Sequence, residues 1–341
     1  MSTPLQGITV ADAPERLRVL PKEPREKLTS KWASLVVVVV TVLWTIPTFG
    51  LAITSLRPKL DAQTSGWWDV FLHPQHLTLS NYHDVLAGTG ASGGSIAPYF
   101  INSIAITIPA TLIPLALGSM AAYVLAWVKF RGSTFVFFCI FALQIVPLQL
   151  ALVPLLQLFS HGMSIGHQSL LPLVFTWTTH SGSLTQLHKL TLIPYSGLGG
   201  SFYPVWIAHT MFGLPLVIFL LHNFMSQLPG DLIEAAQVDG ASQFTIFRRI
   251  ILPLSTPALA SVLIFQFLWV WNDLLVATVF TDGTPDHSPI TARLVQLTGS
   301  LGSAQNLLTA GAFIAIVVPL IVFFSLQRFF VRGLLAGSVK S

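Results

Sequence analysis

The chain has 341 residues, of which 53% are apolar and only 9% are charged, and its mean hydropathy is +0.72. Soluble domains carry about 25% charged residues, so this composition excludes an ordinary water-soluble fold and indicates a membrane protein. The formal net charge of +4 comes without a basic stripe interleaved with aromatic residues, which excludes a nucleic-acid-binding surface. The single cysteine, Cys139, excludes a disulfide framework and a cysteine-based zinc site.

Six apolar stretches are each long enough for a helix that crosses a bilayer, which takes about 20 residues. In chain order they are residues 32–56, 99–128, 134–159, 203–222, 257–280 and 307–330. The first follows a polar tail, residues 1–31, and no small-residue cleavage site follows it, so we expect a retained membrane helix. The sequence thus predicts an all-α integral membrane protein with six transmembrane helices.

The distribution of basic residues predicts the orientation of these helices. With the N-terminus in the cytoplasm, the outer segments contain few of the 17 Lys and Arg residues, namely Arg57, Lys59, Lys189 and Arg293. This bias is the one that the positive-inside rule describes. We therefore expect a multi-pass protein whose two tails, residues 1–31 and 331–341, both lie in the cytoplasm.

Two long connections fall outside in this topology, residues 57–98 and 160–202. The second contains a short apolar piece, Leu170–Trp177, which cannot span a bilayer and is expected to be re-entrant or to lie on the surface. Most of the ten histidines also fall in outer segments, without the ligand spacing of a structural zinc site. We expect them to be solvated loop residues and predict no metal site.

The most informative stretch, residues 228–253, lies between the fourth and fifth apolar stretches. Pro229 and Gly230 are expected to end the membrane helix. Asp231 is suited to cap the N-terminus of a short helix, with Glu234 three residues later completing a capping box. Gly240 is suited to a left-handed C-terminal cap.

A second short helix is expected after Gly240. Phe244, Phe247 and Ile251 would lie along one apolar face of this helix, and Pro253 would end it before the next membrane stretch. The two short helices would form a compact unit that protrudes into the cytoplasm. The small side chains of Ala235 and Ala236 would let another surface approach closely.

This stretch resembles the EAA motif of ABC importer permeases. The match consists of Glu234-Ala235-Ala236, Gly240, Ile250 and Leu252-Pro253, and every spacing agrees. Other segments are also similar to this family, including Asn81-Tyr82, Phe100–Ser103, Trp271-Asn272-Asp273 and the C-terminal Arg332–Lys340. Together they cover most of residues 35–341 and resemble the MalG-like subfamily, which serves carbohydrate uptake.

The resemblance implies a type I ABC importer permease fold in a prokaryotic inner membrane. Its permease core would be residues 99–330, with an insertion at 160–202 that the family pattern does not contain, and its cytoplasmic coupling helix would dock on an ATP-binding subunit. The residues implied in that coupling are Glu234, Ala235, Ala236, Asp239, Gly240, Leu252 and Pro253.

The partners implied by the resemblance are a second permease subunit, two ATP-binding subunits and an extracytoplasmic solute-binding protein. The sequence contains no G-x-x-x-x-G-K-[ST] phosphate loop, so ATP and Mg²⁺ would be bound by the partner ATPase and this chain would need no cofactor of its own. No credible grouping of catalytic side chains is present. We therefore predict a transport subunit rather than an enzyme, with a sugar or related polyol as the substrate.

Polar and aromatic side chains within the apolar stretches are the candidates for the substrate path, because sugars are recognised by amide, carboxylate and aromatic groups. These candidates are Asn102, Gln144, Gln149, Trp269, Asn272 and Asp273. Each could instead be a hydrogen-bonding contact between helices or an anchor at the membrane surface. Asp273 is the one carboxylate inside an apolar stretch, which makes it a functional candidate, although Asn272 beside it favours a structural role.

A secondary transporter driven by an ion gradient is the alternative function. It would need ion- or proton-handling groups within the membrane, and only Asp273 is available for that task.

Overall fold

The computed structural model describes residues 31–128, 130–161, 163–165, 168–171, 174–181, 184–191, 202–281, 283–298 and 304–338. The chain divides into two units, residues 1–51 and 52–341. Most of α1 (Lys31–Ser55) belongs to the first unit, and this helix is apolar around its whole circumference, as is typical of a membrane-spanning helix. The predicted N-terminal tail lies outside the described residues, apart from Lys31 at the start of α1.

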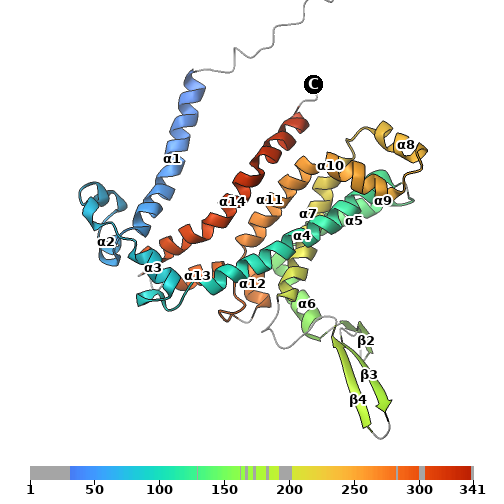
Figure 1. Ribbon diagram of the computed structural model, residues 1–341, viewed down its shortest axis with the longest axis horizontal. Helices are drawn as coiled ribbons and strands as arrows, with labels where there is room; N and C mark the ends of the chain where they lie inside the picture. Colours follow the sequence, from blue (N-terminus) through green and yellow to red (C-terminus); the bar gives the residue numbers. More distant parts are fainter. Residues whose placement is uncertain are drawn as a thin grey trace, which may run out of the picture. The chain divides into compact units, whose positions relative to one another are not determined.

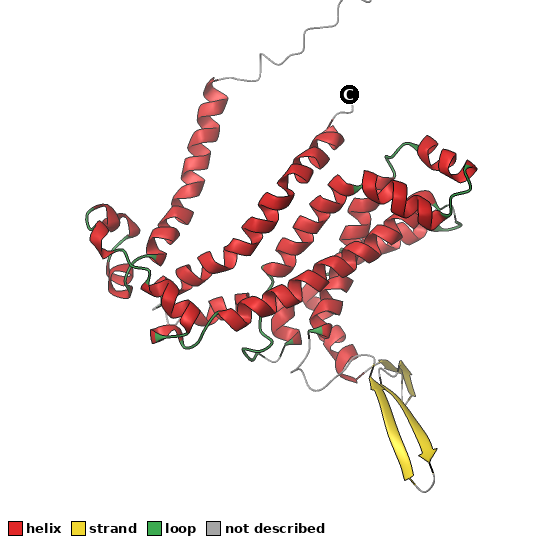
Figure 2. Cartoon of the chain, viewed as in Figure 1, coloured by secondary structure: helices red, strands yellow, loops and turns green. Residues whose placement is uncertain are grey.

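The second unit contains the remaining elements (Figures 1 and 2). Its N-terminal part consists of α2 (Lys59–Thr64), the 3₁₀ turns η4 (Trp67–Phe71) and η5 (Pro74–His76), α3 (Ser80–Ala87) and the turn η6 (Gly90–Ser92). The longer helices that follow are α4 (Ala97–Trp127), α5 (Ser133–Leu143), α6 (Leu148–His161) and α7 (Tyr203–Met225). The later elements are α8 (Gly230–Val238), α9 (Gln243–Ile246), the π turn η7 (Phe247–Ile251), α10 (Leu252–Leu254), α11 (Thr256–Trp271), α12 (Leu275–Phe280), α13 (Ile290–Leu297) and α14 (Gln305–Ser338).

Four helices are individually long and apolar enough to cross a membrane, namely α1, α4, α7 and α14. Two further candidates are bent pairs: α5 with α6, which meet at 98°, and residues 243–254 with α11, which meet at 76°. Six spans therefore result if each bent pair counts as one. Helix α14 continues to Ser338, beyond the predicted end of the last span at residue 330.

Two of the predicted spans are interrupted. The predicted third span, residues 134–159, breaks between Leu143 and Leu148, where Pro147 has no N–H to continue a helical hydrogen-bond pattern. The predicted fifth span, residues 257–280, stops at Trp271 and resumes at Leu275. Hydropathy averaged over a window is insensitive to such breaks, because a few residues change the average little and the average contains no information about backbone hydrogen bonds.

The predicted insertion, residues 160–202, contains β-structure. Strands β1 (Met163–Ile165) and β2 (Gln168–Leu171) form one antiparallel hairpin, and β3 (Val174–Ser181) and β4 (Leu184–Thr191) form another. Of the apolar piece Leu170–Trp177, the described residues therefore belong to two strands of different hairpins, β2 and β3.

Helix α4 packs along α7 and α11, and each of its ends contributes to a separate apolar cluster. The α8 cluster, at the C-terminal end of α4, consists of the buried residues Ala122, Tyr123, Val217, Leu221, Met225, Ile233, Ala236, Ile246, Phe247, Ile251 and Val262. The α13 cluster, at the N-terminal end, consists of Val85, Ile96, Phe267, Trp271, Ile290, Leu297, Leu307, Ala310 and Ala315.

Candidate functional site

The two ends of the short helix α8 are stabilised in different ways. It starts after Pro229, and no side chain caps its N-terminus, so the predicted capping box of Asp231 and Glu234 is wrong. Asp231 lies in the first turn instead, where its carboxylate interacts favourably with the helix dipole. The predicted left-handed glycine is confirmed, because Gly240 has a φ of +77°.

Two backbone hydrogen bonds close the C-terminus of α8 in the pattern of a Schellman motif. Ala241 N–H donates to Ala236 O (2.9 Å), and Gly240 N–H donates to Gln237 O (3.0 Å). An added Cβ at Gly240 would meet no atom within 4 Å, so the requirement for glycine is one of backbone conformation and not of space.

The two faces of α8 have different environments. Ile233 and Ala236, three residues apart, are buried in the α8 cluster. Glu234, Ala235 and Asp239 are exposed. Ala236 therefore packs within this chain, whereas Ala235 leaves room for an approaching surface.

Val238 also lies on the exposed side of α8 and is 87% exposed. It was not among the residues singled out in the sequence. An apolar residue that falls outside the buried i, i+3 pattern of Ile233 and Ala236 is the signal that could have identified it.

The second part of the segment starts at Ser242, whose Oγ accepts a hydrogen bond from Thr245 N (3.3 Å). Ile246, Phe247 and Ile251 are buried in the α8 cluster, but Phe244 is 62% exposed, so the predicted apolar face of Phe244, Phe247 and Ile251 is partly wrong. The π turn over Phe247–Ile251 accounts for the buried residues that follow, because its i, i+5 spacing brings Ile246 and Ile251 to the same side.

The coupling segment, which we define as residues 228–253, is fastened to the ends of α4 and α7. Tyr123 OH on α4 donates to Gln243 Oε1 (2.5 Å), and the ring of Tyr123 lies 5.2 Å from that of Phe247. Trp127 Nε1 on α4 donates to Met225 O of α7 (3.0 Å). These contacts join the segment to two long helices through a packed cluster.

A cavity of about 540 Å³ lies beside the break between α5 and α6, and residues of α7 and α11 form its other walls. Of the predicted substrate-path residues, Gln144 and Trp269 line this cavity, whereas Asn102, Gln149, Asn272 and Asp273 do not. Gln266 lines it as well and is 1% exposed. The sequence signal for Gln266 was available, since it is an amide within an apolar stretch.

Asn102 has a different role in the structure. Its Nδ2 donates to Pro285 O (2.8 Å) and Ser288 O (3.0 Å), and the neighbouring Ser103 Oγ accepts from Ile290 N (2.7 Å). These bonds fix the loop before α13 to the start of α4. Of the two roles that the sequence left open for Asn102, these bonds favour the structural one.

The Asn81 side chain ties together three segments of the second unit. Its Nδ2 donates to Ser55 O and Arg57 O, both at 2.8 Å, and its Oδ1 accepts from Asn306 Nδ2 of α14 (2.7 Å). Tyr82 OH lies 2.8 Å from Ser55 Oγ. The Asn-Tyr pair that resembles the family pattern therefore anchors α3.

Asp273 and Asn272 lie in the break between α11 and α12. The Asp273 carboxylate accepts from Val276 N (3.3 Å) and Ala277 N (3.0 Å), which caps the start of α12. Asn272 Nδ2 donates to Leu268 O within its own helix (2.8 Å). Both side chains therefore have structural hydrogen bonds.

His209 on α7 is fully buried, and its Nε2 lies 3.5 Å from Asp273 Oδ2. Among the described residues, neither nitrogen of its ring has a hydrogen-bond partner. The ring packs edge-on against Trp269 with centroids 5.5 Å apart. His209 was not singled out in the sequence, although an ionisable ring within an apolar stretch is a recognisable signal.

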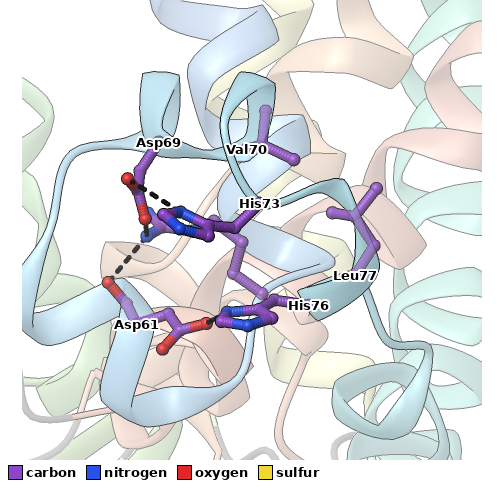
Figure 3. Close-up of a pocket in the computed structure, with 7 residues that line it drawn as sticks. Asp61, Asp69, Val70, His73, His76 and Leu77 are labelled. Carbon is purple, nitrogen blue, oxygen red and sulfur yellow. Dashed lines mark hydrogen bonds and ion pairs between the residues drawn. The ribbon is translucent and has the colours of Figure 1, made fainter.

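The segment after α1 is held by Arg57, which is 3% exposed. Its guanidinium donates to Asp61 O (2.9 Å) and Ser65 O (3.1 Å) and lies 3.9 Å from the Asp69 carboxylate. His76 Nδ1 pairs with Asp61 Oδ2 (2.9 Å), and His73 Nδ1 lies 3.4 Å from Asp69 Oδ1 (Figure 3). These two histidines are thus half-exposed partners of aspartates. In the part of the chain that the structure describes, no group of three or more His, Cys, Asp and Glu side chains is placed to hold a metal.

Comparison with known proteins gives three findings. The family model described as "Binding-protein-dependent transport system inner membrane component" matches residues 114–335. The osmoprotective compounds uptake permease protein GgtD of Synechocystis is 47% identical over 90% of this chain and 91% of its own length. The alpha-glucoside transport system permease protein AglG of Rhizobium meliloti is 47% identical over 78% of this chain and 61% of its own length.

Solved structures show the same fold. A chain of a bacterial ABC transporter involved in the import of the acidic polysaccharide alginate matches with a TM-score of 0.63 and 18% identity, over 92% of this chain and 100% of that one. A chain from the same kind of transporter, in complex with a periplasmic protein bound to an alginate pentasaccharide, matches with a TM-score of 0.56 and 14% identity, over 87% of this chain and 93% of that chain.

Proposed function

This chain belongs to the family of binding-protein-dependent transport inner-membrane components, and from that membership we propose that it imports a sugar or a related polyol. Family membership makes it a membrane-embedded permease subunit of an ABC importer, which is a transport subunit and not an enzyme. The predicted all-helical type I permease fold is confirmed by the likeness to an ABC importer chain, with the β-hairpins of the insertion as an addition. The family favours this function over an ion-driven secondary transporter.

The proposed cargo is supported by the names of relatives. One relative is named for the uptake of osmoprotective compounds and another for the transport of α-glucosides. The proposed assembly contains a second permease subunit, two ATP-binding subunits that hold ATP and Mg²⁺, and an extracytoplasmic solute-binding protein. The chain would form half of the translocation path, with both termini in the cytoplasm as the distribution of basic residues indicates.

The observation that carries the proposed coupling is the two-sided helix α8. Its inner face, Ile233 and Ala236, is packed into the cluster that also contains parts of α4 and α7. Its outer face presents Glu234, Ala235 and Val238. An ATPase subunit that moves while bound to the outer face would move α4 and α7 with it, and this movement would produce alternating access. Leu252 and Pro253, at the end of the coupling segment, would fix its connection to α11.

Replacement of Gly240 tests this coupling. In the assembled transporter, Gly240→Val is expected to reduce the ATP hydrolysis stimulated by loaded binding protein by at least about tenfold, because a β-branched residue is strained at a φ of +77° and would unwind the end of α8. The measurement is stimulated minus basal ATP hydrolysis in proteoliposomes.

Gly283→Val is the matched control, since Gly283 has a φ of +73° and open space around its Cα, but lies in the loop before α13. We expect this variant to keep stimulated ATP hydrolysis. Wild-type stimulation in the Gly240 variant would count decisively against α8 as the coupling element.

A further inference from the structure

Helix α4 is one continuous helix although Pro109 and Pro114 lie inside it (Figure 1). Proline has no N–H, so the carbonyl four residues before it in a helix loses its usual donor. In α4 these are the carbonyls of Ala105 and Ala110. A bilayer offers no water to replace the missing donor, and prolines are the usual points at which a helix bends. Both carbonyls therefore need a donor from a neighbouring helix.

Side chains of α7 and α11 supply these donors. Trp206 Nε1 on α7 donates to Ala105 O (3.0 Å). Gln266 Nε2 on α11 donates to Ala110 O (3.4 Å). Gln266 is 1% exposed, and an added Cβ at Gly213 of α7 would lie 2.6 Å from its Nε2, so the amide is closely confined between α7 and α4. Both carbonyls that the prolines of α4 leave free are thus bonded to a neighbouring helix.

The same arrangement occurs in α14. Pro319 lies inside this helix and leaves Ala315 O without its usual donor. Trp271 Nε1 on α11 donates to that carbonyl (3.2 Å), and Trp271 is 3% exposed. An indole N–H is a donor only, so a carbonyl that lacks its backbone donor is a suitable partner for it. We call the bonds of Trp206, Gln266 and Trp271 to these carbonyls the proline-linked bonds.

The contact between Trp127 and Met225 O has the same spacing. Pro229 follows Met225 by four residues, and Trp127 Nε1 of α4 donates to the Met225 carbonyl at the end of α7. Four side-chain donors of one helix therefore bond to a carbonyl of another helix that precedes a proline by four residues. Prolines are uncommon inside helices, so this repeated spacing indicates a common physical cause and not an incidental set of contacts.

The donors of the proline-linked bonds lie on the two helices that adjoin the coupling segment in the sequence. Helix α7 ends at Met225, just before this segment, and α11 starts at Thr256, just after it. Helices α4 and α14, which carry the acceptors, both pack against α11. Lipid chains are as apolar as the side chains between helices, so apolar packing defines the axial register of two helices less sharply than a hydrogen bond to one carbonyl does. The proline-linked bonds therefore set the register of α4 and α14 relative to the helices next to the coupling segment.

We propose that Trp206, Gln266 and Trp271 are positioning residues for the coupling between α8 and the far ends of α4 and α14. Their bonds to the carbonyls that prolines leave free hold these two helices in a fixed register with α7 and α11. A displacement of the coupling segment then moves α4 and α14 as whole helices and is not absorbed by bending at the prolines. This inference rests on the proposed coupling through α8 and extends it to side chains within the membrane.

The test pairs each donor with the proline that makes it necessary. Trp206→Phe keeps an aromatic ring but removes the indole N–H, and Pro109→Ala gives Ala105 O a backbone donor again. The measurement is stimulated minus basal ATP hydrolysis in proteoliposomes that contain the complete transporter. The stimulus is binding protein loaded with maltose, sucrose or trehalose, whichever stimulates wild type most.

Trp206→Phe is expected to lower the stimulated hydrolysis about tenfold and to leave basal hydrolysis unchanged, because one buried carbonyl loses its partner and α4 bends at that point. Pro109→Ala and the double variant Trp206→Phe/Pro109→Ala are both expected to remain within about twofold of wild type. A residue that served only to fill space would not be made dispensable by a backbone donor on another helix.

A second cycle uses Trp271→Phe and Pro319→Ala, with the same expected outcome. The two cycles also serve as matched controls for each other. Pro319→Ala is expected not to restore Trp206→Phe, and Pro109→Ala is expected not to restore Trp271→Phe, because each proline frees only its own carbonyl.

A third cycle uses Gln266→Leu and Pro114→Ala. The bond from Gln266 to Ala110 O is the longest of the three, so its loss is expected to lower the stimulated hydrolysis only about threefold. Pro114→Ala is expected to restore it. This rescue also separates the role of the amide as a donor to α4 from its position at the cavity wall.

Wild-type stimulation in both Trp206→Phe and Trp271→Phe would overturn the proposal. A loss that the matching proline variant does not restore would also overturn it, and so would restoration by the other proline variant. Loss of stimulation in Pro109→Ala alone would contradict it as well, since Ala105 O keeps a donor there. Size-exclusion chromatography in detergent measures assembly first, and a tryptophan variant that assembles only with its matching proline variant counts as restored, whereas one that assembles in neither background counts against the proposal.

Gly240→Val in the same assay distinguishes failure of these bonds from failure of the proposed coupling. If Gly240→Val keeps wild-type stimulation, the coupling through α8 fails. If Gly240→Val loses stimulation and the tryptophan variants keep it, only the role of the proline-linked bonds fails. If no sugar stimulates wild type, the proposed cargo fails, and hydrogen–deuterium exchange of residues 101–112 in the assembled complex decides the role of these bonds: Trp206→Phe should speed this exchange, and Pro109→Ala should restore it.

Discussion

The two ends of α4 are fastened in different ways. At its C-terminal end, Tyr123 and Trp127 join a packed apolar cluster that contains the coupling segment. At its N-terminal end, Asn102 and Ser103 hold the loop before α13 through hydrogen bonds to three backbone groups. Apolar packing is non-directional and resists separation of whole elements, whereas a hydrogen bond fixes one backbone group in one place.

The apolar packing at the C-terminal end suits the coupling proposed for it. The coupling segment has to move as a unit with α4 and α7, and a densely packed cluster transmits displacement. In the loop at the other end, residues 283–286 are exposed, and three hydrogen bonds to Asn102 and Ser103 hold its backbone beside the α13 cluster. Substitutions that disturb one set of contacts at a time test this difference.

The largest effect is expected from the apolar end. Ile246→Ala removes a fully buried side chain of the α8 cluster and is expected to destabilise the coupling segment by about 2–4 kcal/mol, through lost burial and the resulting cavity. Hydrogen–deuterium exchange in residues 243–251 measures this effect directly. Phe244→Ala is the matched control, because Phe244 lies in the same short helix but is 62% exposed, and its exchange should resemble wild type. Equal protection in Ile246→Ala and wild type would show that the cluster does not hold the segment.

A smaller effect is expected from the hydrogen-bonded end. Asn102→Ala leaves the carbonyls of Pro285 and Ser288 without their donor and is expected to cost about 1–3 kcal/mol. The change should appear as faster exchange in residues 283–290 and leave residues 243–251 unaffected, because the two ends are separate. Asn272→Ala is the control, since among the described residues that exposed amide bonds only to Leu268 O of its own helix. Loss of protection at both ends in Asn102→Ala would contradict the separation.

The smallest effect is expected at the start of α9. Ser242→Ala removes the side-chain acceptor for Thr245 N and is expected to cost about 1 kcal/mol. Thermal unfolding in detergent and exchange at Thr245 measure this loss. Ser226→Ala, which removes an exposed hydroxyl bonded to His222 O at the end of α7, is the control and should have little effect. A cost as large as that of Ile246→Ala would show that the cap, and not the cluster, determines the position of α9.

The sequence alone determined the features that depend on local composition and spacing. Apolar content and the placement of basic residues indicated a membrane protein and the apolar stretches that could span the bilayer. The position of Gly240 after a short amphipathic run indicated the end of α8, because few residues other than glycine adopt a positive φ readily. The spacing from Glu234 to Pro253 indicated the family before any fold was known.

Only the tertiary structure decided where the apolar stretches break and which polar side chains meet. Gln144 and Gln149 are equivalent in sequence, yet only Gln144 lines the cavity, because the chain turns through 98° after α5. Asn102 was indistinguishable from a substrate-path residue until its loop partners, 183 and 186 residues further on, were in place. His209 and Asp273 meet for the same reason. The direction of a side chain depends on how distant segments pack, and composition, spacing and hydropathy are local quantities that contain no information about that packing.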